Sequence, residues 1–327
     1  MRLSSGGLMV NYRCHCACGH CLYLSSPTRD GDYITKDCAK ETIARLTRMG
    51  CPSLHIGGGE PFLKPEGLLD VLEVMQNAHM PVDYIETNGA WYKDRDSALS
   101  LMREVKRLGG SCVMVSTCPY HNEFVPLQKM MDALSAIRDA RLDYFAWQDR
   151  FIPDMAKFDP QRVHKRAEYE QRFGKDYWRK LADRFGIGMN GRALLTYRST
   201  MTPRAPQALE SFNSPCTQLN TSRHYHIDCK GYFLPSGCMG LSLPLAALEH
   251  GYADADYPIY TLLAKGGVKA LYEKCISQGF TPRDKYATRC ELCIDLRLFL
   301  RDSKPGQYKE LTPDDYYREY AREASIG

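Results

Sequence analysis

Short apolar runs alternate with longer amphipathic segments along the first half of the chain. The runs have the length and composition of buried β-strands and read "GLMVNY", "SLHIGGG", "VDYIETNG", "CVMVST" and "DYFAWQ". The segments between them repeat apolar residues at helical spacing, as Leu68, Leu72 and Met75 do between residues 64 and 80. Thr35 is placed to cap the first of these predicted helices.

Strands that alternate with helices are typical of an α/β fold with a parallel sheet and right-handed crossovers. The segment "IGMNGRALLTYR", residues 187–198, is expected to return to the sheet as a sixth strand. In such folds the ligand site forms at the carboxyl ends of the strands. The polar stretches that follow the strands, such as "ETNG" and "STCPYHNE", are therefore expected to converge.

The alternation stops near residue 204, so we expect two domains, 1–204 and 205–327. In the second domain, "YHIDCKGYFLPSGC" predicts a hairpin that turns at Lys230 and Gly231. The polar, tyrosine-rich end of the chain, from Arg301, is expected to form a peripheral helix.

Composition and charge narrow the class of protein. The formal net charge of +4 is small for 327 residues, so a nucleic-acid partner is not expected. No apolar run approaches the roughly 20 residues that span a bilayer, and the N-terminus lacks the apolar stretch of a signal peptide. We therefore expect a cytoplasmic protein without a membrane partner.

The chain has 14 cysteines, and a reducing compartment disfavours disulfides, which leaves metal or iron–sulfur ligation as the leading explanation for the clustered ones. Four thiols fall close together in "NYRCHCACGHCLYL", residues 11–24, and six others lie in the last third. The remaining four stand singly among apolar residues and are expected to be small buried side chains: Cys38, Cys51, Cys112 and Cys118.

The first cysteine group has the spacing CxxxCxxC over Cys14, Cys18 and Cys21. Three thiolates on one loop can bind three irons of a cubane cluster and leave the fourth iron open, whereas a closed structural site needs four protein ligands. The alternative is a zinc knuckle that uses Cys14, Cys16, Cys18 and Cys21, or a set with His15 or His20. If the site is a cluster, Cys16 is expected to point elsewhere on the loop.

A glycine-rich turn, "GGGEPF", follows the second predicted strand at Gly57–Phe62. Glycines allow close approach of the backbone to a ligand, and a carboxylate at Glu60 can receive an ammonium group. Cysteine loop and turn together resemble the radical S-adenosylmethionine (radical SAM) superfamily over roughly residues 8–200. The matching residues are Cys14, Cys18, Cys21, Gly58, Gly59, Glu60 and Pro61.

The resemblance implies a fold, a cofactor and a reaction. The fold would be a partial (β/α)6 TIM-type barrel, followed here by a smaller cysteine-rich domain. The cofactors would be a 4Fe-4S cluster and S-adenosylmethionine, which is reductively cleaved to a 5′-deoxyadenosyl radical. The implied cofactor contacts are Gly57, Gly58, Gly59, Glu60, Glu86, Thr87, Asn88, Ser116 and His20.

Three of these contacts carry alternatives. Thr87 and Asn88 are equally explained as capping or turn residues. His20 stands where the superfamily usually has an aromatic residue near the adenine, and Tyr23 is an alternative for that contact. The stretch "NGRA", residues 190–193, resembles a late-strand segment of members that carry an extra cluster domain.

The second cysteine group loosely resembles the auxiliary-cluster domains, of SPASM or twitch type, that follow many radical SAM cores. It implies one auxiliary 4Fe-4S cluster on Cys216, Cys238, Cys290 and Cys293. Cys229 and Cys275 are reserve ligands, and zinc or no metal is the alternative.

Substrate chemistry is the least constrained expectation. His121 and Glu123 follow the fourth predicted strand and are candidates for acid–base work, and Cys118 is a candidate hydrogen-atom donor. The expected substrate is a ribosomally made peptide, with a flavodoxin or ferredoxin as electron donor. The alternatives are maturation of a small-molecule cofactor or natural product, and a non-catalytic iron–sulfur or zinc protein.

Overall fold

The computed structural model describes residue 3 and residues 5–221 and 223–326, and the chain divides into two compact units. Unit 1 contains Met1–Gly19, Ser25–Gly186 and His226–Gly231. Unit 2 contains His20–Leu24, Ile187–Tyr225 and Tyr232–Gly327. The main division therefore falls at residue 186, earlier in the chain than the domain boundary expected at residue 204.

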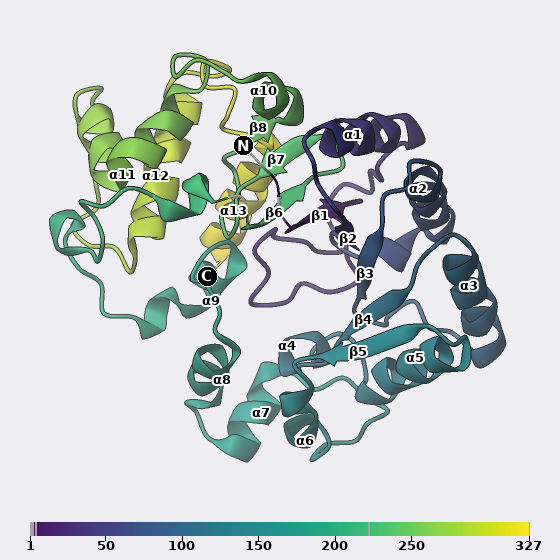
Figure 1. Ribbon diagram of the computed structural model, residues 1–327. Helices are drawn as coiled ribbons and strands as arrows, with labels where there is room; N and C mark the ends of the chain where they lie inside the picture. The colour runs from purple at the N-terminus through teal and green to yellow at the C-terminus, as the bar shows by residue number, and fades with distance from the viewer. Residues whose placement is uncertain (1–2, 4, 222, 327) are drawn as a thin grey trace. The chain divides into compact units, whose positions relative to one another are not determined.

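Unit 1 is built on a sheet of parallel strands, as the alternating pattern predicted (Figure 1). Its strands lie in the order β5-β4-β3-β2-β1. Their bounds are β1 (Ser5–Met9), β2 (Leu54–Gly57), β3 (Val82–Thr87), β4 (Cys112–Ser116) and β5 (Asp143–Trp147). Each pair of neighbours runs parallel, so all five carboxyl ends lie at one edge of the sheet.

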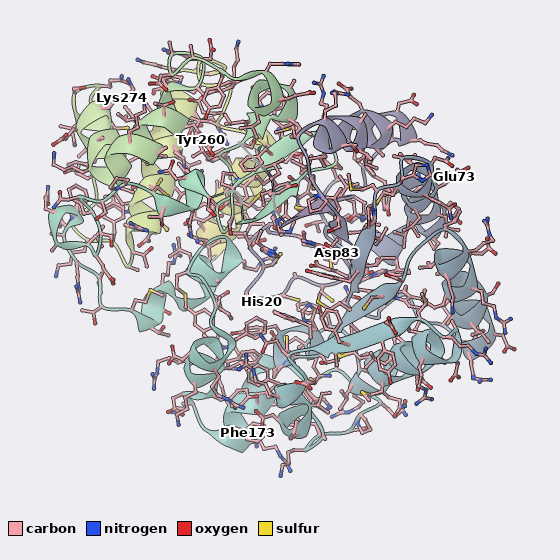
Figure 2. All side chains as sticks on the ribbon, viewed as in Figure 1. His20, Glu73, Asp83, Phe173, Tyr260 and Lys274 are labelled. Atoms are coloured by element: carbon pink, nitrogen blue, oxygen red, sulfur yellow. The ribbon has the colours of Figure 1, made fainter. Side chains whose placement is uncertain are left out.

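Four helices lie along one face of this sheet (Figure 1). They are α1 (Lys36–Arg48), α2 (Pro65–Asn77), α3 (Arg95–Arg107) and α5 (Leu127–Asp139). The predicted stripe of α2 is buried, and Leu72 has no exposed surface, a burial that contributes about 1.5–3 kcal/mol to stability. Glu73 on the outer side of α2 points away from the sheet and pairs with Lys36 (Figure 2). Thr35 caps α1 as predicted, because its side chain accepts a hydrogen bond from the Cys38 amide.

The predicted sixth strand is wrong. Residues 192–197 form helix α9 (Arg192–Tyr197), so this segment adds no strand to the open sheet. The buried apolar residues are Ala193, Leu194 and Tyr197, which share one side of a helix but not of a strand. Gly191, with φ +56°, breaks the extended backbone just before the helix.

Strand β5 is followed by short helices whose aromatic side chains pack together. These helices are α6 (Ile152–Met155), α7 (Arg166–Phe173) and α8 (Tyr177–Phe185). Tyr169 and Trp178 are buried at 0% and 1% exposure, and they lie 5.5 Å apart, edge to face. Charged positions of this segment, such as Arg179 and Asp183, face outward.

Unit 2 is mainly helical. Besides α9 it contains α10 (Leu245–His250), α11 (Pro258–Ile276), α12 (Arg289–Ser303) and α13 (Asp314–Ile326). The last is the helix predicted near the end of the chain, but it buries Tyr316, Tyr317 and Tyr320 and so is not peripheral. Strands β6 (Arg223–Ile227) and β7 (Tyr232–Leu234) flank the turn predicted at Lys230 and Gly231, and β7 pairs antiparallel with β8 (Leu243–Pro244). Within the described ranges, no helix has the length and apolar character that crossing a membrane requires.

Candidate functional site

The cysteine loop, residues 11–24, begins two residues after the last residue of β1, the buried Met9. Cys14 and Cys18 are 7% and 5% exposed. The Cys14 sulfur accepts hydrogen bonds from the Cys16 amide and from the Asn88 side chain, both at 3.3 Å. Asn88 directly follows β3, so this bond fixes the loop to the neighbouring strand end. Donors aimed at a thiolate sulfur are also one of the features that set the potential of an iron–sulfur cluster.

Cys16 does not point away from the other thiols, contrary to expectation. It is 1% exposed, and its hydrogen bonds with Cys14 and Cys18 raise its thiol pKa far above the usual value, with burial acting in the same direction. Cys21 lies in unit 2, where its carbonyl accepts a hydrogen bond from the Arg192 amide at 2.9 Å.

Among the described residues, no three Cys, His, Asp or Glu side chains are gathered around a single point as one metal ion requires. A cubane cluster makes a different demand, because each cysteine binds a different iron. Closely spaced buried thiols, one of them already accepting two hydrogen bonds, are a donor set that fits such a cluster.

The glycine-rich turn packs against the backbone of the cysteine loop. The Gly59 amide donates to the Asn11 carbonyl at 2.9 Å, and the Glu60 amide donates to the Arg13 carbonyl at 3.0 Å. A Cβ atom on Gly59 would lie 2.1 Å from that Arg13 oxygen. The side chain of Asn11 adds bonds to both amides, at 3.1 and 3.2 Å. The glycine at position 59 is therefore needed for the protein's own close packing, a reason that differs from the expected approach to a ligand.

Glu60 is fully buried and joins the ends of β2 and β3. Its carboxylate accepts hydrogen bonds from the Thr87 hydroxyl at 2.7 Å, the Asn88 amide at 2.9 Å and the Phe62 amide at 3.1 Å. Burial raises its pKa to about 7, against the opposing effect of these three donors. Thr87 and Asn88 thus act on Glu60, and a contact of Glu60 with a cofactor ammonium stays a prediction.

Glu86 belongs to a buried polar group that the sequence did not indicate. Its carboxylate would meet a Cβ on Gly57 at 2.7 Å and lies 3.7 Å from Nε2 of His55. His55 Nε2 lies 3.1 Å from His226 Nε2. Burial and then the Glu60 charge raise the pKa of Glu86 to about 7, although 33% of its side chain is exposed. An inward-facing histidine in the otherwise apolar run "SLHIG" was the available signal.

The predicted acid–base residues lie beside the cysteine loop. His121 Nδ1 is 3.0 Å from the Cys118 sulfur, and Cys118 is fully buried. Burial alone would lower the pKa of His121, but the neighbouring sulfurs of Cys18 and Cys118 raise it well above the usual value. Glu123 accepts a hydrogen bond from the Arg166 amide at 3.2 Å, and burial raises its pKa to about 7.

The two remaining predicted contacts lie in different units. Ser116 is the last residue of β4 in unit 1 and is 9% exposed. His20 belongs to the short segment His20–Leu24 of unit 2, and it is labelled in Figure 2.

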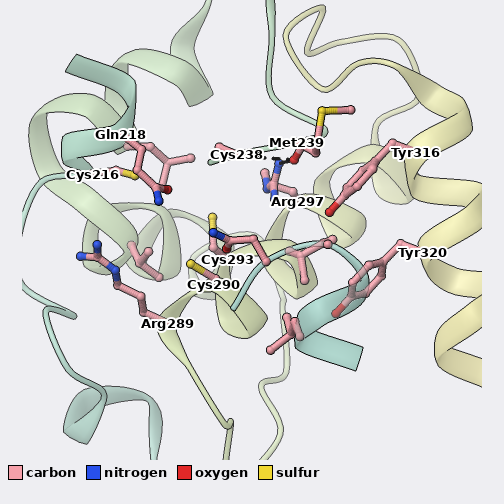
Figure 3. Close-up of a pocket in the computed structure, with 16 residues that line it drawn as sticks. Cys216, Gln218, Cys238, Met239, Arg289, Cys290, Cys293, Arg297, Tyr316 and Tyr320 are labelled. Atoms are coloured by element: carbon pink, nitrogen blue, oxygen red, sulfur yellow. Dashed lines mark hydrogen bonds between the residues drawn. The ribbon is translucent and has the colours of Figure 1, made fainter. Parts of the chain in front are cut away.

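Unit 2 brings four predicted auxiliary ligands to one cavity of about 40 Å³ (Figure 3). Cys290 and Cys293 lie in the first turn of α12, where Thr288 caps the helix by accepting from the Glu291 amide. The other two are Cys216, whose amide bonds the Leu263 carbonyl, and Cys238. Reserve residue Cys275 is buried in α11 away from this lining, and reserve residue Cys229 belongs to unit 1.

The same cavity contains a buried cation, Arg297, that sequence reasoning missed. Arg297 is 4% exposed, and its Nη1 donates to the Met239 carbonyl at 2.8 Å and to the Tyr317 hydroxyl at 3.2 Å. Its Nε has no hydrogen-bond partner, and within the described residues no carboxylate lies at ion-pair distance from it. A buried positive charge and an unpaired donor beside four thiols fit an anionic group such as a thiolate-bound cluster.

Burial and the Arg297 charge act oppositely on these thiols. Burial raises the pKa of Cys238 to about 12 and that of Cys290 to about 11. Arg297 is the main opposing charge at Cys238, whereas at Cys290 Arg289 lowers the pKa more than Arg297 does. Burial also raises the pKa of the Cys293 thiol, and Arg297 is the main charge that lowers it. Iron or zinc would bind the deprotonated forms and remove this protonation.

The "NGRA" stretch lies between the two cysteine regions of unit 2. The Arg192 amide binds the Cys21 carbonyl, and a Cβ on Gly191 would lie 2.3 Å from the Leu22 carbonyl oxygen. The Asn190 side chain donates to the Gly237 carbonyl at 2.7 Å, one residue before Cys238.

Known proteins resemble the part of this chain that contains the cysteine loop and the glycine-rich turn. Residues 7–130 match the family described as "4Fe-4S single cluster domain". The mycofactocin maturase MftC of Mycobacterium tuberculosis (strain CDC 1551 / Oshkosh) is 35% identical over 80 residues, which are 24% of this chain and 20% of that protein. YydG of Bacillus subtilis (strain 168), whose name assigns it to peptide biosynthesis, is 24% identical over 130 residues, 39% of this chain and 40% of that protein. The chain thus spans about a fifth to two fifths of these relatives.

A solved structure with a similar fold is anSMEcpe with bound AdoMet, at 12% identity and a TM-score of 0.44 over 99% of this chain and 100% of that one. SuiB of Streptococcus suis, bound to S-adenosylmethionine, has 12% identity and a TM-score of 0.38 over 97% of this chain and 77% of that one. Both TM-scores are below 0.5.

Replacing Gly59 with alanine tests the packing of the turn on the loop. The added Cβ has no room beside the Arg13 carbonyl, so the free energy of unfolding should fall by about 1–3 kcal/mol. Gly188→Ala is the matched control, since its nearest neighbouring atom would lie 3.8 Å away, and its effect should stay within about 0.5 kcal/mol. Denaturant unfolding measures both, and equal effects would contradict the packing argument.

Single alanine variants of the loop test which thiols bind iron. Cys16→Ala should keep the 4Fe-4S absorbance and iron content, because three ligands suffice when one iron stays open. Cys18→Ala should lose most of the iron. The two residues are matched in burial, at 1% and 5% exposure, so loss of buried volume alone predicts similar effects. Loss of iron in Cys16→Ala would show that Cys16 is a ligand.

Proposed function

We propose that this member of the radical S-adenosylmethionine superfamily cleaves S-adenosylmethionine reductively and uses the resulting radical to abstract a hydrogen atom from its substrate. The observation that carries the proposal is the joining of cysteine loop, glycine-rich turn and β3 end by hydrogen bonds at Asn11, Glu60 and Asn88. A fixed loop of this kind holds reacting groups in one geometry, which is what radical chemistry at a cofactor requires of the protein.

In this proposal the cluster is held by Cys14, Cys18 and Cys21. When bound, the cluster and S-adenosylmethionine supply a 5′-deoxyadenosyl radical. The contacts to S-adenosylmethionine come from the strand ends, from Gly57–Glu60, from Glu86–Asn88 and from Ser116, with His20 near the adenine.

Three residues beside Cys18 act on the substrate. His121 or Glu123 accepts or donates the proton that accompanies oxidation, and the pKa of Glu123 at about 7 suits proton transfer near neutral pH. Cys118 is the candidate hydrogen-atom donor, and its sulfur lies 3.0 Å from Nδ1 of His121.

The cysteines of unit 2 hold an auxiliary 4Fe-4S cluster that assists oxidation or substrate binding. The shared cavity of Cys216, Cys238, Cys290 and Cys293 supports this. The Nε of Arg297, which has no hydrogen-bond partner, supports this further. A thiolate-ligated cluster would supply a negatively charged partner for this buried cation.

The proposed substrate is a peptide, and the proposed donor is a flavodoxin or ferredoxin in the cytoplasm. The printed names of a mycofactocin maturase and a peptide biosynthesis protein support peptide chemistry. Maturation of a small-molecule cofactor or natural product is the alternative, and a coding sequence for a short precursor peptide beside this gene would favour the peptide.

Cofactor cleavage can be measured without knowing the substrate. After anaerobic reconstitution and reduction, the protein should convert S-adenosylmethionine to 5′-deoxyadenosine and methionine. The Cys18→Ala variant should lose this activity, and Cys51→Ala, another buried thiol outside the loop, should keep it. Absence of 5′-deoxyadenosine from protein that holds its loop irons would sink the radical proposal and favour a non-catalytic iron–sulfur protein.

Iron analysis tests the auxiliary cluster independently. A Cys14, Cys18 and Cys21 triple alanine variant should still bind about four irons per chain. Adding Cys290→Ala should reduce that number sharply, whereas adding Cys275→Ala, which removes a buried thiol outside the cavity, should not. Zinc without iron, or no metal at all, in the triple variant would overturn the auxiliary cluster.

A further inference from the structure

We propose that Arg297 is a positioning residue for the auxiliary cluster and that its buried positive charge makes this cluster easier to reduce. The inference rests on the proposed function, because it requires that Cys216, Cys238, Cys290 and Cys293 hold an iron–sulfur cluster. It adds a residue and an electrostatic role to that cluster.

Helix α12 places Arg297 and two of the cysteines on one side. Cys290, Cys293 and Arg297 stand at positions i, i+3 and i+7, which share a helix face. The Nη1 of Arg297 also donates a hydrogen bond to the carbonyl of Met239, the residue after Cys238. Arg297 therefore joins α12 to the segment that carries Cys238 and Met239 (Figure 3).

The charge of Arg297 is buried, and among the described residues the side chains that offset it are the Cys293 and Cys238 sulfurs and Tyr317, with no carboxylate at ion-pair distance. The residue is 4% exposed, and its guanidinium bonds the Met239 carbonyl, the Tyr317 hydroxyl and the Cys293 side chain. Its Nε remains without a hydrogen bond. A guanidinium cannot lose its proton to relieve this burial, since its pKa lies above about 12. A buried cation of this kind needs an anionic partner to offset its desolvation.

A thiolate-bound cluster supplies that partner, and the interaction depends on its oxidation state. Uptake of one electron makes the cluster more negative while no bond forms or breaks. In a water-excluded cavity a nearby cation stabilises the more negative state more strongly than the less negative one. Arg297 should therefore raise the reduction potential, which suits a cluster that accepts an electron from an oxidised substrate.

A second arginine of the cavity provides a matched comparison. Arg289 also lines the cavity beside Cys290, but it is only partly buried and its Nη1 binds the Ser211 carbonyl at 3.3 Å. Solvent screens the charge of an exposed group. Removing the Arg289 charge should therefore change the potential less than removing the Arg297 charge.

The test uses the full chain with the Cys14, Cys18 and Cys21 triple alanine background, so that the auxiliary cluster alone gives a signal. Redox titration with dithionite, followed by electron paramagnetic resonance, should give a lower potential in Arg297→Met. We expect at least about a tenfold lower ratio of reduced to oxidised cluster at a fixed potential, which is about 59 mV for a one-electron couple. Arg297→Lys should recover most of the parental value, and Arg289→Met should shift it less.

The outcomes separate the inference from the proposed function. If the triple alanine parent contains no iron, the proposal of an auxiliary cluster is itself wrong. Full iron content with an unchanged potential in Arg297→Met overturns the inference and leaves the cluster in place. If Arg297→Met folds but loses iron, the Arg297→Gln and Arg297→Lys variants show whether the positive charge is needed. Iron bound at the parental potential in Arg297→Lys, but not in Arg297→Gln, supports a requirement for the charge. Iron lost from all three variants overturns the inference in favour of a purely structural role.

Discussion

The close packing of the glycine-rich turn against the backbone of the cysteine loop is the constraint on which unit 1 depends. The glycine-rich turn lies so close to residues 11–13 that no side chain fits at position 59. Asn11 and Glu60 then satisfy the polar groups that this contact buries, with hydrogen bonds of 3.2 Å or less. Buried backbone amides without partners would each cost about 1–3 kcal/mol, so the contact and its hydrogen bonds form together. The loop that carries the cysteines is held by the sheet as a result.

The two cysteine regions offer different electrostatic surroundings. Around the first loop are three carboxylates, the buried Glu60 and the partly buried Glu86 and Glu123, and desolvation raises the pKa of each to about 7. Around the cavity of unit 2 the buried group is a permanent cation, Arg297. Surroundings that can take up protons suit a site of hydrogen-atom and proton transfer, and a fixed cation suits a site of electron uptake.

Local patterns predicted the elements well where burial alone determines them. The stripe on α2, the Thr35 cap and the turn at Gly231 all follow from residue spacing or turn chemistry. The sixth strand failed because "GRALLTYR" contains apolar residues compatible with both periods, and Gly191 and the Arg192–Glu323 pair decide in favour of a helix. Glu323 lies more than a hundred residues away, and no local pattern reveals such a partner. The same applies to Arg297, whose neighbours come from Cys238–Met239 and α13, and to the His55–His226 contact.

The five residues from Asn190 to Leu194 have a consequence for the order of both cysteine regions. The Arg192 amide holds the carbonyl of Cys21, and the Asn190 side chain holds the carbonyl before Cys238. One short segment therefore orders a ligand of each cysteine region. The two carbonyls are thus ordered by one segment of unit 2, and fixing one of them spends part of the conformational entropy that fixing the other would cost.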